Sequence, residues 1–296
     1  MGHRRSDRRE LGRDTPHPAG VLSRGDLGPG ARRRAAHPRG ARLARPPAPV
    51  VNELTLLQFP SDAELASAAA REFIRFATSP GTPTGPRTVA LSGGRIARGF
   101  CTALAHLAPA ESPGLGSVHF FWGDERCVPP TDPESNFALA NQHLLQPLGI
   151  PAGRIHRIRG ELPPPAAAAE AERELREILA SPNGTVPRID LVILGMGEDG
   201  HVASLFPGDP VADTATSPLF RPVVASKPPP NRITASYTLI REAREVWVLA
   251  SGAGKAPALA QSLLTTETPL GNVRATRTRV RVFTDIPQLA AAVTTR

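Results

Sequence analysis

Asp199 and His201 are the residue pair with the clearest potential for chemistry in this sequence. They lie in the run DLVILGMGEDGHVASLFPG, residues 190–208, directly after the short apolar segment 191–194. Branched apolar residues in so short a run indicate a buried parallel strand. Histidine transfers protons near neutral pH, and α/β folds keep their active sites in loops at the carboxyl ends of strands. We therefore expect His201 to transfer a proton, with Asp199 beside it.

Two other interpretations of this run are open. Its glycines match the G-x-G-x-x-G pattern of dinucleotide-binding loops. That pattern requires an acidic residue about 20 positions further on, at the end of the next strand. The next apolar segment, 220–225, ends instead in Ser226 and Lys227, which disfavours dinucleotide binding. An ordinary glycine-rich turn with a solvated histidine is the second alternative.

A second loop of interest follows the strand expected at 88–91 and precedes an expected helix. It consists of Ser92, Gly93, Gly94 and Arg95. Glycines at such a place let backbone N–H groups approach an anion at the helix N-terminus. The segment is not a Walker loop, because Phe100 and Cys101 stand where the lysine and hydroxyl residue would be. An anion-binding loop and a plain tight turn are both compatible with it.

Charged residues also follow three other expected strands. Asp124, Glu125 and Arg126 come after the apolar strand at 117–122 and are not buried there without partners, so they form a site or a solvated loop. Arg232 lies in the segment 231–234 and Lys255 in the segment 252–256. A lysine at a helix start opposes the helix dipole, which a bound phosphate would compensate. A surface lysine is the alternative.

The order of the expected elements predicts one α/β domain. Strands are expected at 54–59, 88–91, 117–122, 189–194, 220–225, 233–236, 245–250 and 280–284. Helices are expected at 61–76, 95–107, 135–145 and 166–180, and from about Lys255 and Pro287, with a Pro/Gly loop at 80–87. Strands that alternate with helices predict a Rossmann-like, mainly parallel sheet with helices on both faces.

The first 46 residues differ from the rest in composition. They hold twelve arginines and four acidic residues, a formal net charge of +8 that equals that of the whole chain. Few branched or aromatic residues are present, so too little apolar surface could be buried to offset the entropy of ordering. We expect a disordered extension at 1–48, or upstream sequence included by an early start, and a catalytic domain at 49–296. An RNA-binding arm is the alternative.

The remaining composition excludes several classes of protein. Cys101 and Cys127 form neither a metal-binding spacing nor a disulfide framework. No apolar run reaches the roughly 18 residues needed to span a membrane, so we expect a soluble cytoplasmic protein. A Gly-x-Ser-x-Gly elbow is missing, which disfavours a serine hydrolase.

Taken together, the motifs resemble those of 6-phosphogluconolactonases, in the family that also contains glucosamine-6-phosphate isomerases (deaminases). The shared strings are SGG, GDERxVPxxDxxSN, LGMGxDGHxASLFPG, RIT and GxxKA, in that order along residues 50–290. The resemblance implies the isomerase/deaminase fold and hydrolysis of 6-phospho-D-glucono-1,5-lactone to 6-phospho-D-gluconate. That reaction is the second step of the oxidative pentose phosphate pathway and uses no metal or nucleotide cofactor.

The resemblance also implies roles for individual residues. His201 matches the proton-transfer residue, which we expect to activate water for attack on the lactone, and Asp199 and Asp124 match polar site residues. The residues expected around the phosphate are Ser92, Gly93, Gly94, Arg95, Arg126, Arg232 and Lys255. We expect a small phosphorylated lactone as the partner, with no nucleic acid or membrane required, and a monomer or weak oligomer.

Two sequence positions help to choose among a lactonase, a deaminase or isomerase, and a sugar-phosphate sensor. Deaminases of this fold carry a glutamate five residues after the corresponding histidine, where this chain has Phe206. The lactonase is therefore favoured over a deaminase or isomerase, and retention of Asp199 with His201 argues against a catalytically silent sugar-phosphate sensor. Lactonases commonly continue SGG with Ser/Thr-x-Pro, whereas this chain continues with Arg95, so Arg95 is a candidate replacement for a missing hydroxyl.

Overall fold

The structure is a computed structural model that describes residues 53–79, 87–111, 115–182, 184–211, 217–275 and 279–287. The chain divides into two units, 1–47 and 48–296, and the described residues all belong to the second. The extension expected at 1–48 lies outside the described residues. The same holds for the loop expected at 80–87, apart from Arg87, and for the helix expected from Pro287 onward.

Six parallel strands form the central sheet. Their order is β1 (Leu54–Gln58), β9 (Arg279–Thr284), β8 (Glu245–Ala250), β5 (Leu191–Gly195), β2 (Arg87–Leu91) and β3 (Val118–Trp122). All five neighbouring pairs are parallel. The central strands β5 and β8 are almost entirely buried, as strands covered on both faces are. The predicted strands of this sheet and their parallel arrangement are confirmed.

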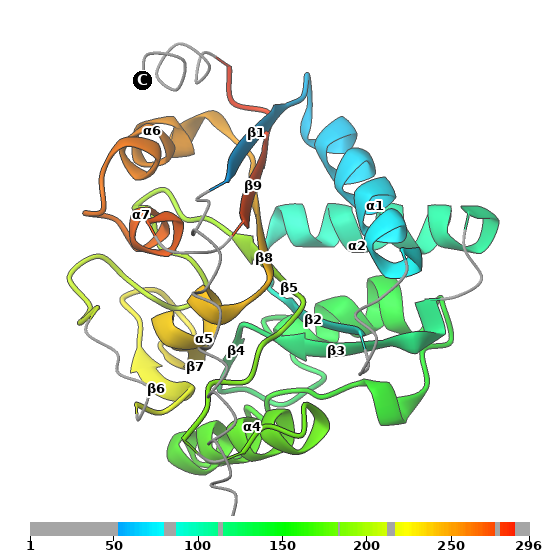
Figure 1. The fold of residues 1–296 in the computed structure, drawn as a ribbon, viewed down its shortest axis with the longest axis vertical. Coiled ribbons are helices and arrows are strands. Elements are labelled where there is room, and N and C mark those ends of the chain that lie inside the picture. The colour runs from blue at the N-terminus through cyan, green and yellow to red at the C-terminus, as the bar shows by residue number, and fades with distance from the viewer. Residues whose placement is uncertain are drawn as a thin grey trace, which may run out of the picture. The chain divides into compact units, whose positions relative to one another are not determined.

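Helices cover both faces of the sheet (Figure 1). α1 (Asp62–Thr78) packs against α2 (Arg95–Glu111) on one side, and α6 (Ala256–Leu264) packs against α7 (Pro269–Arg274) on the other. α1 begins at Ser61 as predicted, because the Ser61 hydroxyl accepts a hydrogen bond from the Glu64 backbone N–H at 3.2 Å. The fold class predicted from the sequence is confirmed.

The remaining helical elements are α4 (Pro164–Ile178) and several short segments. α3 (Asn136–Ala140) continues into a π-helical turn at Asn141–Leu145, and α5 spans Tyr237–Glu242. Single 3₁₀ turns lie at Leu115–Ser117, Ala152–Arg154 and Ala253–Lys255. α5 and α7 were not predicted, because six residues are too few to show a helical repeat. Ser236 and Thr268 cap them.

A second, antiparallel sheet was also not predicted. Its order is β4 (Asp124–Arg126), β7 (Asn231–Ala235) and β6 (Phe220–Val224). The charged segment 124–126, expected as part of a site or as a solvated loop, is a three-residue strand whose residues pair with 232–234. Three consecutive charged residues carry no strand pattern, since the strand exists only through pairing with a segment about a hundred residues later. This pairing holds Arg126 opposite Arg232.

The strand order creates a switch point between β2 and β5. The strand of this sheet that follows β2 is β3, on one side, and the strand of this sheet that follows β5 is β8, on the other side. Crevices that bind ligands lie at such points, outside the carboxyl ends of the strands. The loops after β2 and β5 are in close contact here, since a Cβ on Gly195 would lie 3.5 Å from the carbonyl oxygen of Gly93.

Candidate active site

A cavity of about 150 Å³ lies at this switch point. It is lined by Ser92, Gly93, Gly94, Arg95, Ile96, Asp124, Arg126, Asn136, Gly195, Met196, His201, Ala203, Arg232 and Lys255. Every site residue predicted from the sequence lines it except Asp199, which contacts the lining residue His201. Five separate loops or strands therefore bring the predicted residues to one place, as expected at the carboxyl edge of a parallel sheet.

His201 and Asp199 form a hydrogen-bonded pair in the loop after β5. His201 Nδ1 lies 2.5 Å from Asp199 Oδ1, which also accepts the backbone N–H of His201 at 3.2 Å. Partial burial raises the pKa of Asp199, but the hydrogen bonds from His201 and its charge outweigh burial and lower that pKa overall. A carboxylate at Nδ1 fixes the tautomer that leaves Nε2 as the base. The pair can therefore accept a proton at Nε2.

Gly197 and Gly200 allow the backbone to turn this tightly. A Cβ on Gly197 would lie 2.1 Å from His201 Nδ1 and 2.6 Å from Asp199 Oδ1, far inside van der Waals contact. Gly200 has a φ of +83°, a left-handed conformation that favours glycine. The glycines of this run therefore serve the close approach of the histidine and aspartate rather than a dinucleotide phosphate.

Asp124 is a buried carboxylate with a full set of partners. It is 4% exposed; its Oδ2 accepts the Ser204 hydroxyl at 2.8 Å, and its Oδ1 accepts Asn136 Nδ2 at 3.2 Å. Asn136 Nδ2 also donates to the Asp124 carbonyl oxygen at 2.9 Å. A Cβ on Gly93 would lie 1.7 Å from Asn136 Oδ1, so only glycine lets Asn136 reach this place. Asn136 belongs to the string GDERxVPxxDxxSN and to the start of an expected helix, but it was not predicted as a site residue.

Arg126 and Arg232 face the cavity from the small sheet. Arg232 is 7% exposed and donates to the carbonyl oxygens of Pro229 and Lys227 at 3.0 and 3.3 Å. Burial and the nearby charge of Arg126 lower the pKa of Arg232. Arg126 donates to the Glu134 carbonyl oxygen at 2.6 Å, with the Glu134 carboxylate 3.7 Å away. Two guanidinium groups held side by side favour an anion between them.

Arg95 and Lys255 supply positive charge from the N-termini of α2 and α6. Arg95 pairs with Asp62 and donates to the Ser251 hydroxyl at 3.1 Å. Burial and the charge of Arg95 lower the pKa of Lys255. The buried Ser92 hydroxyl is among the side-chain atoms of the described residues that have no hydrogen-bond partner. A hydroxyl, two cations and a helix N-terminus form a suitable environment for a phosphate.

Phe206 lies against the catalytic histidine expected from the sequence. Its ring centroid is 5.1 Å from that of His201, and the Arg232 guanidinium lies 6.0 Å from the same ring. The position five residues after His201 therefore presents an apolar ring to the imidazole where deaminases of this fold are expected to have a carboxylate.

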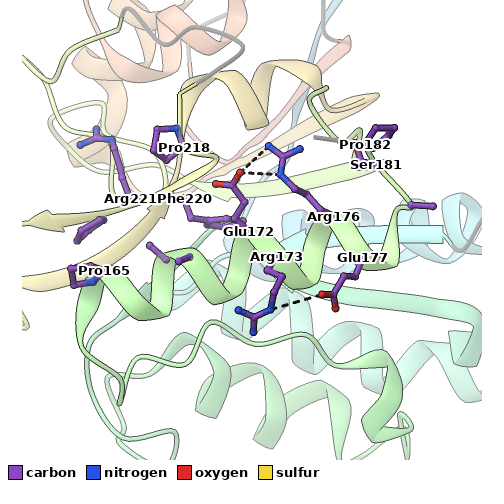
Figure 2. Close-up of a pocket in the computed structure, with 14 residues that line it drawn as sticks. Pro165, Glu172, Arg173, Arg176, Glu177, Ser181, Pro182, Pro218, Phe220 and Arg221 are labelled. Atoms are coloured by element: carbon purple, nitrogen blue, oxygen red, sulfur yellow. Dashed lines mark hydrogen bonds and ion pairs between the residues drawn. The ribbon is translucent and has the colours of Figure 1, made fainter. Parts of the chain in front are cut away.

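A larger cavity, of about 860 Å³, lies between α4 and β6 (Figure 2). Its floor is apolar, with Phe220 and Pro218 among the lining residues. Its charged side chains are all paired: Glu172 with Arg176 and Arg173 with Glu177 (Figure 2), and Arg221 with Asp209 outside the cavity lining. These internal pairs leave it poorly suited to orient a charged substrate, and none of the predicted site residues lines it.

The described residues also bear on metal binding and on membrane insertion. No group of three or more His, Cys, Asp or Glu side chains there is arranged to hold a metal ion. No helix in the same part of the chain is long and apolar enough to cross a membrane. The expectation that no cofactor is used remains a prediction.

Fold and site together define an α/β protein with a cation-lined cavity and a His–Asp pair at the carboxyl edge of its sheet. The chain belongs to the family of glucosamine-6-phosphate isomerases and 6-phosphogluconolactonases, whose model matches residues 60–282. This confirms the resemblance seen in the sequence motifs.

Several relatives carry lactonase names. "Probable 6-phosphogluconolactonase 3, chloroplastic" of rice (Oryza sativa) is 38% identical over 217 residues, which cover 69% of this chain and 64% of the relative. The chain thus spans a little under two thirds of that protein. The 6-phosphogluconolactonase of Mycobacterium tuberculosis is 34% identical over 212 residues, which cover 69% of this chain and 84% of the relative.

Solved structures show the same fold. The 6-phosphogluconolactonase of Trypanosoma brucei superposes with a TM-score of 0.68 at 27% identity, covering 82% of this chain and 99% of that chain. A monomeric glucosamine-6-phosphate deaminase superposes with a TM-score of 0.64 at 19% identity, covering 81% of this chain and 99% of that chain. The second likeness concerns the fold alone.

Proposed function

We propose that this protein hydrolyses 6-phospho-D-glucono-1,5-lactone to 6-phospho-D-gluconate, the second step of the oxidative pentose phosphate pathway. One observation carries the proposal: the His201–Asp199 pair shares a cavity with four cationic side chains. A phosphorylated lactone needs both a base for water and a binding site for a dianion. The lactonase names of the relatives support the same choice.

The proposed mechanism is direct attack by water on the lactone carbonyl. His201 Nε2 removes a proton from water as the water oxygen bonds to C1, while Asp199 holds the imidazole through Nδ1. The tetrahedral intermediate then collapses, the bond from C1 to the ring oxygen breaks, and His201 returns the proton to that oxygen. The new carboxylic acid loses its own proton to solvent. A δ-lactone is already activated, so no covalent intermediate is required.

Asp124 and the glycine-rich loops would complete the reaction centre. Asp124 is held rigidly by Ser204 and Asn136, so its carboxylate is placed to fix substrate hydroxyls. Two sets of backbone amides are candidates for binding the oxyanion, near Gly93 and Gly94 or from Gly195 to Gly197. Both loops border the cavity.

We assign the phosphate to the cations and to the loop after β2. Lys255 is partly desolvated, and Arg95 stands where relatives commonly have a hydroxyl residue, so both would gain from a bound dianion. Ser92 contributes a buried hydroxyl that lacks a partner among the described residues. Arg126 and Arg232 complete the positive surroundings. The cytoplasmic location and the monomeric or weakly oligomeric state expected from the sequence remain predictions.

The test is lactone hydrolysis by the purified protein. The lactone is generated in situ, and its disappearance is compared with the spontaneous rate. A general base contributes roughly 10²–10⁴ to the rate, so His201→Ala should lose about that much turnover. His106→Ala, on the exposed face of α2, is the matched control and should keep full activity. No acceleration by the wild type would refute the proposed function, and full turnover by His201→Ala would refute the mechanism.

A further inference from the structure

We propose that Glu125 is the positioning residue of this site, fastening the strand that carries Asp124 and Arg126 to the helix that begins at Asn136. The contacts of Glu125 do not depend on which reaction the site performs. Its expected effect on lactone hydrolysis rests on the function proposed above. Glu125 does not line the cavity, so it acts through its neighbours rather than on substrate.

The Glu125 carboxylate accepts four hydrogen bonds while being only 2% exposed. Oε1 accepts the backbone N–H groups of Arg126 at 2.7 Å and Asn136 at 2.8 Å. Oε2 accepts the backbone N–H of Phe137 at 2.8 Å and the Ser135 hydroxyl at 3.1 Å. One side chain thus satisfies N–H groups at the first turn of α3 that have no partner within the helix.

These bonds set the position of the residues that do line the cavity. The Asn136 backbone is held by Glu125, and the Asn136 amide then donates to the carbonyl and carboxylate oxygens of Asp124. Asn136 also fills the space above Gly93 in the loop after β2. A shift of α3 would therefore displace Asp124 and that loop together.

The electrostatics of Glu125 differ from those of a structural surface carboxylate. Burial raises its pKa to about 7, although the hydrogen bonds from Asn136, Phe137 and Arg126 act to lower it and the charge of Asp124 raises it further. The charged or titratable groups around it are Asp124 and Arg126 on its own strand, Cys127 next to them, Glu134 before α3 and Arg232 on β7.

Replacement of the carboxylate would weaken these contacts. Only a carboxylate offers two oxygens that accept without donating, so an amide or a shorter side chain leaves some of the four donors unsatisfied. The pKa of Glu125 is raised because burial outweighs these hydrogen bonds, so the positioning role rests on the contacts themselves and not on a change of protonation.

The kinetic test compares wild type with Glu125→Gln, which keeps the shape but not the charge. Turnover at saturating lactone and the thermal midpoint are measured for both, with the spontaneous rate subtracted. We expect Glu125→Gln to lose about tenfold to a hundredfold in kcat, because misplacement of site residues by about 1 Å has effects of that order. Glu125→Ala should lose more kcat than Glu125→Gln, because the amide oxygen of Gln can still accept from the backbone N–H groups of Arg126 and Asn136.

Asp190→Asn is the matched control for loss of a buried carboxylate. Asp190 is 8% exposed and accepts the backbone N–H of Thr88 at 2.9 Å, but it lies before β5 and not at the site. This variant should lose thermal stability and keep the wild-type kcat. Glu125→Gln with wild-type kcat, or Asp190→Asn with the same loss of kcat, would overturn the proposal.

Hydrogen exchange separates this proposal from the proposed function, because it needs no turnover. After correction for intrinsic exchange, the Asn136 and Phe137 amides should be protected in the wild type and lose protection in Glu125→Gln, because Glu125 accepts both. Protected amides in a protein without lactonase activity would refute the function and leave the positioning role intact. Amides that are as well protected in Glu125→Gln as in the wild type would overturn the role of Glu125 whatever the activity.

Discussion

Gly197→Ala tests whether the His201–Asp199 pair is held by the backbone beneath it. The added Cβ would lie 2.1 Å from His201 Nδ1 and 2.6 Å from Asp199 Oδ1. Ordinary contact between such atoms is roughly 3.5 Å, so the imidazole must move by about 1.4 Å or the loop must deform. Either change breaks the 2.5 Å contact that orients the base.

The magnitude follows from this displacement. A misplacement of about 1 Å can reduce catalysis by about 10², so kcat for lactone hydrolysis should fall about a hundredfold. KM should change little, because the cations lie on other loops. The thermal midpoint should change modestly, since the imidazole can turn toward solvent.

Gly153→Ala is the matched control, because a Cβ there meets no atom within 4 Å. Both variants are assayed for lactone hydrolysis and for thermal unfolding. If Gly197→Ala retains kcat within threefold of wild type while folding normally, the close packing of His201 over this glycine is not what positions the base.

Three further predictions concern charge at the site. Lys255→Ala should raise KM about tenfold to a hundredfold and leave kcat nearly unchanged in steady-state kinetics, because a hydrogen bond to a charged group contributes about 1.5–3 kcal/mol; an unchanged KM would contradict the phosphate assignment. Arg95→Ser, which restores a hydroxyl, should raise KM only a few-fold at low salt, because Arg95 is largely exposed and already paired with Asp62. Folding raises the pKa of Glu125 from 4.5 to about 7, so the folded state binds this proton more tightly than the unfolded state. The free energy of unfolding of the protein should therefore decrease by about 3 kcal/mol as pH rises between these two values. Urea unfolding of Glu125→Gln should lack this component.

The sequence was sufficient to predict the central sheet because its strands carry local signals. Glu245–Ala250 is an apolar run bounded by polar residues and was predicted with the bounds found in the structure. Ser61 caps α1 through a contact three residues away. Signals within one element are readable before any tertiary contact is known.

The small antiparallel sheet could not be predicted in the same way. Asp124, Glu125 and Arg126 are three charged residues, and charges are unfavourable in a strand unless distant partners compensate them. Those partners are the strand at 231–235, the Ser204 hydroxyl and the first turn of α3. Their proximity depends on the whole fold, so the local sequence left a site and a solvated loop open and gave no sign of a strand.

The site residues likewise divide into those paired within one loop and those brought together by the whole fold. Asp199 and His201 are two residues apart, so their pairing is a property of one loop, and the motif predicted which residues would be adjacent. The cations come from four separate segments, and motif order alone could not show that Arg95 pairs with Asp62 or that Arg232 binds the carbonyl oxygens of Lys227 and Pro229.

The difference between a pair held by one loop and cations gathered from four segments has a physical consequence. The proton-transfer pair is rigid because a glycine-rich turn holds both members, whereas the anion-binding surface is assembled from elements that meet only in the complete fold. Placing like charges such as Arg126 and Arg232 together costs stability, and burial of Lys255 adds to that cost. In the proposed function, a bound dianion would relieve both costs at once. Binding energy from the phosphate end of the lactone would then help to position its carbonyl for attack by water.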